Sequence, residues 1–134
     1  MAVEPSFAAT VRTGSALLGN AETNLQVPTT TSTIITAGAS GTKIEEIVLE
    51  ATTTSLVPVT VAGLVYVFLH DGTTYHLYDT LVVTAVTASS SAVPFRYSKT
   101  YTNLWMPTSW SVRCSQSIAG NASILKCTIF GGDF

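Results

Sequence analysis

Two histidines and two aspartates lie within ten residues of one another in the segment VFLHDGTTYHLYD, which runs from Val67 to Asp79. They are His70, Asp71, His76 and Asp79. Imidazole nitrogens and carboxylate oxygens are zinc ligands, and they are also the groups that most often donate and accept protons in catalysis. Because the chain has no other histidine, a metal centre or an acid–base site is expected in this segment if the protein has one.

The backbone that carries these four groups is predicted to be a β-hairpin. Asp71 and Gly72 stand between two runs of strand-forming residues, which is the strongest short-range signal of a two-residue type I′ turn. Such a turn sets the strand pairing, and side chains alternate between the faces of a sheet, so His70 and His76 point to opposite faces. Asp79 falls about 20 Å along the strands from His70. We therefore expect no metal site and no cofactor here, unless a three-residue loop with a bulge changes the pairing and brings the histidines together.

No other motif of the chain favours catalysis. The sequence contains no GxSxG elbow, and neither histidine has a supporting acid placed by a motif, which argues against a serine hydrolase. The paired glycines near the carboxyl terminus are not followed by a helix pattern, so they do not predict a phosphate-binding loop. We expect no catalytic residue, and the protein is predicted not to be an enzyme.

The two cysteines, Cys114 and Cys127, are too few for a disulfide scaffold and have no Cys or His neighbour at zinc-like spacing. If Gly120 and Asn121 form the two-residue turn of a terminal hairpin, Cys114 faces Cys127 at a position where side chains are closest. A cross-strand disulfide is then geometrically possible, whereas two packed thiols are favoured in a reducing cytoplasm.

The composition indicates an all-β protein whose surface is covered in part by a partner. Charged residues make up 10% of the chain, where soluble domains usually have about 25%. Serine and threonine take their place, and threonine suits a pleated strand better than a helix surface. A surface with so few charges risks self-association unless a partner covers it. The net charge of −2 provides no basic patch, so we expect no nucleic-acid partner.

The chain length of 134 residues is that of one domain. The amino-terminal sequence lacks the pattern of a secretory signal, and no stretch has the 18 apolar residues of a membrane span, so we expect no membrane association. Residues 1–27 are weakly periodic and are interrupted by Pro5, Gly14, Gly19 and Asn20. They are predicted to form an extended N-terminal arm, followed by a single β-sandwich domain over residues 28–134.

Strand patterns recur along the whole of that domain, and no segment favours a helix. The predicted strand segments are residues 29–38, 42–52, 56–70, 73–88, 93–107 and a final hairpin over 110–134. Their spacing is typical of a sandwich or a barrel. The structural turns are predicted at Asp71, Gly72, Gly120 and Asn121. The predicted fold class is therefore an antiparallel β-sandwich.

Several apolar side chains are candidates for contact with a partner. Aromatic residues cluster in the last third of the chain, where Trp105 and Trp110 stand among few charges and fit either a core or the centre of an interface. Stacking of these two rings on a sugar is the alternative. The candidate contacts from the arm are its large apolar residues, Phe7, Val11, Leu17 and Leu18.

The order of three segments carries a resemblance to a known family. TAGASGTKIEEIVLEAT, LVYVFLHDGTTYHLYDTLVVTAVTASSSAVPF and WMPTSWSVRCSQSIAGNASILKCTIFGGDF together resemble small virion proteins of tailed bacteriophages. The pattern of that family runs from a "taGanG..i" turn through "lfiyDGtt..l.dei.Vta.tpS" to a terminal "fGGDF". The similarity covers roughly residues 36–134, and no motif before residue 36 aligns.

The resemblance implies a β-sandwich of the jelly-roll kind that coats or cements a capsid. The implied partners are the major capsid protein and further copies of the chain, often in a homotrimer. The implied location is the capsid surface of the virion, after assembly in the host cytoplasm. Two alternatives remain, a structural protein of the tail or head–tail junction and a sugar-binding module of a receptor-binding protein.

Overall fold

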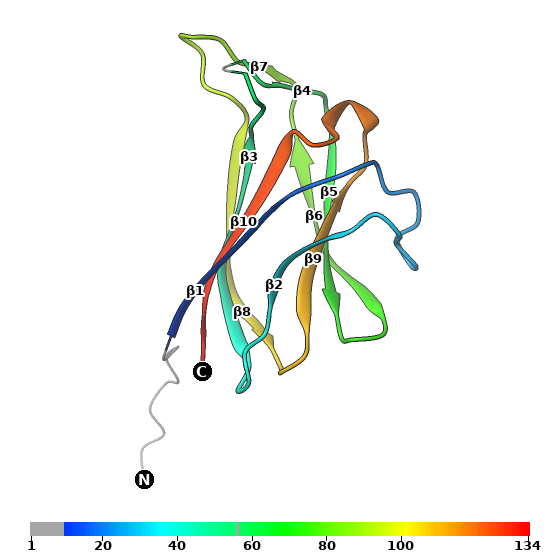
Figure 1. The fold of residues 1–134 in the computed structure, drawn as a ribbon, viewed down its shortest axis with the longest axis vertical. Helices are drawn as coiled ribbons and strands as arrows, with labels where there is room; N and C mark the ends of the chain where they lie inside the picture. The colour runs from blue at the N-terminus through cyan, green and yellow to red at the C-terminus, as the bar shows by residue number, and fades with distance from the viewer. Residues whose placement is uncertain (1–9, 56) are drawn as a thin grey trace.

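The computed structural model describes residues 10–55 and 57–134, which form short and long β-strands joined by loops (Figure 1). In chain order the elements are β1 (Thr10–Leu17), β2 (Ser32–Thr36), β3 (Thr42–Ala51), β4 (Val59–Thr60), β5 (Gly63–His70), β6 (Tyr75–Val83), β7 (Val86–Thr87), β8 (Arg96–Met106), β9 (Ser111–Gln116), the 3₁₀-helix η1 (Ala119–Asn121) and β10 (Leu125–Asp133). Within the described part of the chain there is no helix that could cross a membrane.

Two four-stranded antiparallel sheets face each other across an apolar core. The strand order is β1-β10-β3-β8 in the first, called here the β1 sheet, and β2-β9-β5-β6 in the second, called the β2 sheet; β4 and β7 form a small separate pair. Strands β3, β9 and β10 bury alternate or nearly all of their side chains, and residues from both sheets make up one core cluster. The prediction of an all-β antiparallel sandwich is confirmed.

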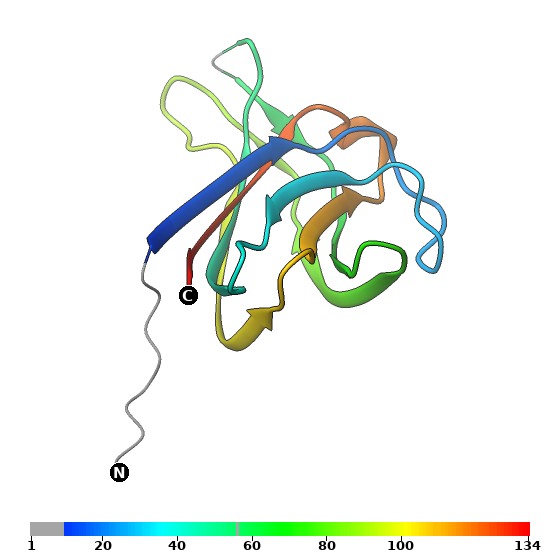
Figure 2. The ribbon, with the colours of Figure 1, turned by 60° about the horizontal axis from the view of Figure 1, so that its bottom comes forward.

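The strand pairs are nested around the turn between β5 and β6. β5 pairs with β6, β3 with β8, β2 with β9 and β1 with β10. Figure 2 shows β1 beside β10 and β2 beside β9, so the first and the last strand lie side by side. The nesting brings residues from the two ends of the sequence into contact, as in the pairing of Thr10 with Asp133.

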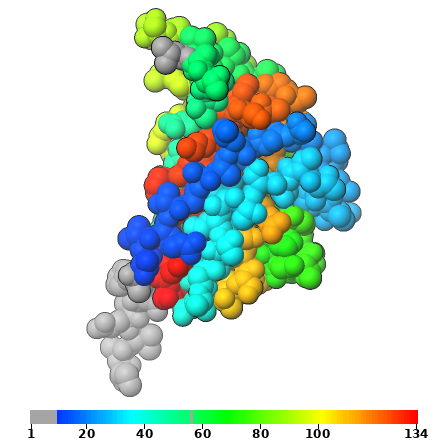
Figure 3. All heavy atoms as spheres, in the orientation of Figure 1, coloured from blue at the N-terminus to red at the C-terminus, as the bar shows by residue number. Residues whose placement is uncertain are grey.

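The predicted N-terminal arm is wrong for residues 10–17, which form the edge strand β1. The reason is that the inward-facing positions of β1 are occupied by Gly14 and Ala16, so the strand has no apolar alternation to detect. Gly14 lies so close to the carbonyl oxygen of Ile34 in β2 that a Cβ atom would collide with it. Figure 3 shows the residues of β1 lying between those of β10 and β2 on this face. Residues 1–9, including Phe7, lie outside the described residues.

The loop between β1 and β2 is organised by a buried carboxylate, Glu22. Its Oε1 accepts hydrogen bonds from the amides of Thr23 and Asn24, both at 3.0 Å, and its Oε2 accepts from the amides of Thr29 at 2.8 Å and Thr30 at 2.7 Å. Burial alone would raise the pKa of the Glu22 carboxyl, but hydrogen bonds from Thr30, Asn24 and Thr29 outweigh it and lower the pKa to about 2. Residues 18–31 therefore belong to the folded body.

The turn at Asp71 and Gly72 has four residues rather than the predicted two, since His70 pairs with Tyr75. Asp71 Oδ1 accepts hydrogen bonds from the amides of Thr73 and Thr74, an arrangement in which the side chain stabilises the longer loop. Gly72 has a positive φ of 104°, which favours glycine. The two extra loop residues leave the alternation of side chains unchanged, and the strands place the histidines on opposite faces as predicted.

The predicted terminal hairpin is wrong. β9 pairs with β2 and β5, whereas β10 pairs with β1 and β3. The segment that contains Gly120 and Asn121 is thus a connection between the two sheets. Asn121 is buried, and its side chain accepts a hydrogen bond from the amide of Val61 and donates one to the Val61 carbonyl, both at 2.8 Å. These two bonds hold the crossing segment in place, so it does not turn back as a tight hairpin.

Candidate functional site

The outer face of the β1 sheet, called here the contact face, is a regular surface formed by four strands. The strand registers arrange its side chains in four rows across β1, β10, β3 and β8. From the end at which β1 begins and β10 ends, these rows are Val11, Gly132, Lys43 and Trp105; Thr13, Phe130, Glu46 and Thr100; Ser15, Thr128, Val48 and Ser98; and Leu17, Lys126, Glu50 and Arg96.

One end of the contact face is apolar and uncovered. Val11 is 86% exposed, Trp105 is 59% exposed and Phe130 is 41% exposed. The middle rows are mainly hydroxyl side chains, and three of the five charges of the face stand in the row at the far end. Single exposed apolar residues are ordinary, but several on one flat surface are typical of an interaction site.

An apolar pocket adjoins this end of the contact face and is called here the Trp105 pocket. It is an open hollow of about 510 Å³ lined by Ser40, Gly41, Trp105, Met106, Pro107 and Phe134. The rings of Trp105 and Phe134 meet edge to face with their centroids 6.0 Å apart. The amide of Phe134 donates to the carbonyl of Gly41 at 3.2 Å. This volume is in the range of pockets that accept small apolar groups.

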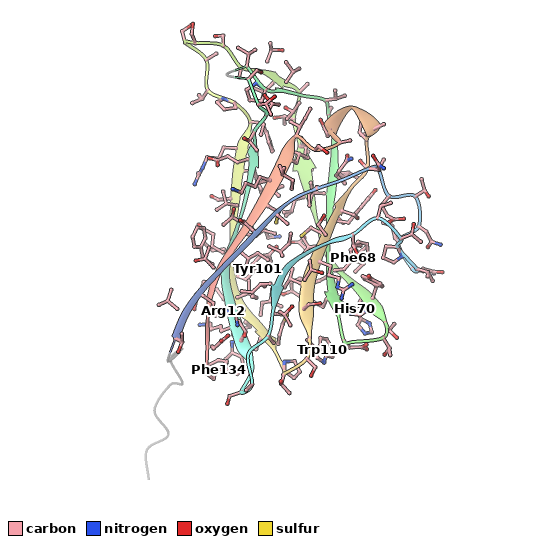
Figure 4. The ribbon with its side chains drawn as sticks, viewed as in Figure 1. Arg12, Phe68, His70, Tyr101, Trp110 and Phe134 are labelled. Carbon is pink, nitrogen blue, oxygen red and sulfur yellow. The ribbon has the colours of Figure 1, made fainter. Side chains whose placement is uncertain are left out.

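A polar cluster near the pocket ties the start of β1 to the end of β10. Arg12 of β1 forms an ion pair with Asp133 of β10 at 2.9 Å and donates to the carbonyl of Thr36 at 3.1 Å. Hydrogen bonds from Thr42 and then from Arg12 lower the pKa of the Asp133 carboxyl. Figure 4 shows Arg12 and Phe134 at the same end of the molecule. The cluster therefore fixes the backbone that carries the apolar end of the contact face.

A second group of polar residues closes the opposite edge of the sandwich. A bulge in β6 places Asp79 opposite Val67, which turns the Asp79 side chain inward. There its Oδ2 accepts hydrogen bonds from Lys99 Nζ at 2.6 Å and from the Tyr101 hydroxyl at 2.9 Å, both on β8 of the other sheet. Burial would raise the pKa of Asp79, but the bonds from Lys99 and Tyr101 lower it. The carboxylate is thereby held ionised between the two sheets.

This group borders a shallow groove of about 420 Å³ lined by Tyr78, Asp79, Lys99, Thr100, Tyr101, Thr102 and Asn103. The hydrogen bond that Lys99 donates to Asp79 raises the pKa of the Lys99 amine, and this effect is larger than the lowering by burial. Burial, and then the bond to Asp79, raise the pKa of the Tyr101 hydroxyl. Lysine and tyrosine thus both keep their protons at neutral pH. The arrangement suits a structural bridge or a polar binding groove better than proton transfer.

The histidine segment is divided between the interior and the surface. His70 is buried against the ring of Tyr75 at 4.4 Å, and its Nδ1 accepts from the amide of Gly72 at 3.2 Å. Burial, and then the charge of Arg113, lower the pKa of His70. His76 is exposed and stacks on Trp110.

One contact within this segment was not predicted from the sequence. His76 Nε2 lies 3.1 Å from Asp71 Oδ2, so the first residue of the loop contacts the second residue of β6. This pair has only two members. Among residues 10–55 and 57–134, no group of three or more His, Cys, Asp or Glu side chains is placed to hold a metal ion.

The structure exposes some of the residues predicted to contact a partner and buries others. Val11, Leu17 and Trp105 are exposed on the contact face. Leu18 is fully buried in the core, so its prediction as a partner contact is wrong. It directly follows the edge strand β1, and its side chain packs inside the sandwich. Trp110 is partly buried and packs against the core. Phe7 lies outside the described residues.

Sequence reasoning missed Phe130 and Phe134, and it missed the bridge from Asp79. Alternation along the last strand, in which Leu125, Cys127 and Ile129 point inward, would have placed Phe130 on the outer face. No local pattern marks the Asp79 bridge, because its partners lie on a strand of the other sheet.

Comparison of the chain with protein-family models, with curated proteins and with solved structures gave no match. The contact face, the Trp105 pocket and the groove beside Asp79 are therefore the features from which a function is argued.

Proposed function

We propose that this protein is a bacteriophage capsid decoration or cement protein, which binds the outside of the major capsid shell and stabilises it. The observation that carries the proposal is the contact face, a four-stranded surface on which exposed apolar side chains gather toward one end and three of the five charges stand in the row at the other end. A protein that binds only the assembled shell stabilises it by mass action. The resemblance of residues 36–134 to small virion proteins supports the same role.

We infer further that the sandwich is a jelly roll. The nested pairing of β1 with β10, β2 with β9, β3 with β8 and β5 with β6 supports this inference, since a jelly roll is a double sheet of eight strands. Viral capsid domains use that architecture, and so do lectin domains. Because one fold serves both classes, the contact face, and not the architecture, supports the capsid role.

The apolar end of the contact face would provide the main contact with the shell. Buried aromatic side chains contribute most to protein interfaces when they sit in well-packed pockets. Trp105 beside its pocket is such an anchor, and Val11 and Phe130 extend the same apolar surface. We propose that the major capsid protein is the partner and that copies of this chain associate with one another on the shell, in a trimer as the resemblance implies.

The test is reconstitution of capsids that lack the protein, with binding measured by co-sedimentation and shell stability by the temperature of genome release. The wild-type chain is expected to bind in hundreds of copies and to raise that temperature. Trp105→Ala should weaken binding about 30-fold, which corresponds to ~2 kcal/mol at a hot spot. Val11→Asp should abolish binding, because it places an unpaired charge in an apolar contact.

The matched control is Val93→Asp. Val93 is 85% exposed, as Val11 is at 86%, but it lies in the loop between β7 and β8, away from the contact face. This variant is expected to bind as the wild type does. Equal loss of binding in both aspartate variants, or unchanged genome release without the protein, would contradict the proposal. A handful of copies per particle would instead indicate a tail or head–tail junction protein.

The exposed ring of Trp105 favours one second candidate, a sugar-binding module of a receptor-binding protein. Flat aromatic rings present an apolar surface with a polar tip, and Trp105 offers its ring beside an open pocket. Under this alternative, Trp105→Ala reduces adsorption of the phage to its host while capsids keep their stability. Under the cement proposal the same variant affects the shell and leaves adsorption unchanged.

A further inference from the structure

Cys114 and Cys127 form a pair that bridges the two sheets. Cys114 lies on β9 of the β2 sheet and Cys127 on β10 of the β1 sheet. Both side chains are fully buried, and their sulfur atoms are 3.7 Å apart. The two thiols are thus in van der Waals contact across the middle of the sandwich, on strands that do not pair with each other.

The neighbours of the pair on the adjacent strands are mainly apolar. Cys114 lies between Val67 of β5 and Ser32 of β2, and Cys127 lies between Leu49 of β3 and Ala16 of β1. The hydrogen bond between the thiols and their burial raise the pKa of the Cys114 thiol. Since the thiolate is the reactive form, the raised pKa lowers the reactivity of Cys114. The complete burial of both side chains keeps an oxidant away from them in the closed sandwich, so any reaction proceeds through transient opening.

We propose that Cys114 and Cys127 are an oxidisable dithiol, which closes to an inter-sheet disulfide when the protein meets a disulfide oxidant. One protein sulfur attacks the oxidant's disulfide and releases the first oxidant thiol. The second protein sulfur then attacks the mixed disulfide and releases the other. Two S–H bonds break and one S–S bond forms in the protein, while the two electrons and two protons reduce the oxidant to two thiols.

The geometry requires a small movement. A disulfide has an S–S distance of about 2.05 Å, so the sulfur atoms must approach by about 1.7 Å from their separation of 3.7 Å. The bond would close a loop between residues that are 13 apart in the chain and would join the two sheets covalently. Closing such a loop restricts the unfolded chain and stabilises the folded one.

The experiment treats the reduced full-length protein with oxidised glutathione at neutral pH under native conditions. Samples are denatured at intervals, alkylated and weighed as intact protein. We expect gradual loss of both alkylatable thiols with no retained glutathione and no link between chains. The midpoint of thermal unfolding should rise by about 5–10 °C and return to its first value after reduction.

Two controls keep the outcome decisive. Cys114→Ala and Cys127→Ala can each take a glutathione adduct at most, and neither should gain stability from the oxidant. The wild-type chain unfolded in urea shows how fast the accessible thiols react. The proposal is overturned if the folded protein keeps both thiols long after the unfolded chain has oxidised. It is equally overturned if glutathione stays attached, if chains become cross-linked, or if the disulfide lowers the unfolding temperature.

Discussion

Glu22 shows how one side chain can organise a loop that has no regular structure. A buried carboxylate is costly unless hydrogen bonds satisfy it. None of the ion pairs within the described residues includes Glu22, and its donors are backbone amides and the hydroxyl of Thr30. The loop from β1 to β2 therefore depends on the charge of this single residue.

Glu22→Gln is expected to lower the free energy of unfolding by about 1–3 kcal/mol at pH 7, because an amide cannot accept all of these bonds. The folded-state pKa of about 2 lies below the ordinary value of 4.5. The stabilising contribution is thus complete above pH 4.5 and is lost as the pH falls toward 2. Urea denaturation of both proteins at pH 7, 4 and 2.5 should show a shrinking difference.

The control for this prediction is Glu45→Gln. The side chain of Glu45 is about half exposed and pairs with Lys43 at the surface, so its removal should change stability little. A difference between wild type and Glu22→Gln that stays constant with pH would count against the role assigned to the Glu22 charge.

At the scale of elements, the position of β1 against β2 requires a residue without a side chain at Gly14. Its contact with β2 closes one edge of the sandwich, and Gly14 is the point of closest approach. An edge strand with small inward residues contributes little apolar burial of its own. It is held instead by its pairing with β10 and by the ion pair from Arg12 to Asp133.

Gly14→Ala is expected to destabilise the protein by about 1–3 kcal/mol, since the new methyl group would overlap the carbonyl of Ile34 and force the strands apart. Gly19→Ala is the matched control, because nothing lies within 4 Å of a Cβ atom at that position. Thermal unfolding of the two variants makes the comparison. Equal midpoints for both would show that β1 can move away from β2 at no cost.

At the scale of the whole molecule, the sandwich is closed differently on its two sides. One side is closed by the contact of β1 with β2, and the other by the polar bridge from Asp79 to Lys99 and Tyr101. A sheet edge carries unpaired backbone groups that invite pairing with another chain. A bridge between β6 and β8 holds both of these edge strands in the folded body.

Tyr101→Phe is expected to lower the free energy of unfolding by about 1–3 kcal/mol, because the buried ring stays in place while the hydrogen bond to the charged Asp79 is lost. Tyr97→Phe is the control on the same strand, since Tyr97 is 38% exposed and none of the side-chain hydrogen bonds found in the described structure involves its hydroxyl. Urea denaturation should give a lower free energy of unfolding for Tyr101→Phe than for Tyr97→Phe. If Tyr101→Phe is as stable as the wild type, Lys99 alone maintains the bridge.

Much of the fold follows from local chemistry. Short runs of β-branched and other apolar residues between turn residues predict strands such as β3 and β5, because this composition is a property of one segment of the chain. The alternation of side chains along a strand places His70 and His76 on opposite faces. The longer turn does not change this result, because a shift of the pairing by two residues keeps the alternation of side chains.

Which strands meet was decided only by the tertiary structure. The sequence predicts Cys114 opposite Cys127 within one hairpin, whereas the two thiols meet across the core from different sheets. The sequence did not predict β1, because inward positions of this strand are glycine and alanine. It did not predict the bridge from Asp79 either, because the partners of Asp79 lie on the other sheet. Alternation determines which face a side chain takes. The strand beside it depends on contacts between residues as distant as Thr10 and Asp133, whose energies no local pattern contains.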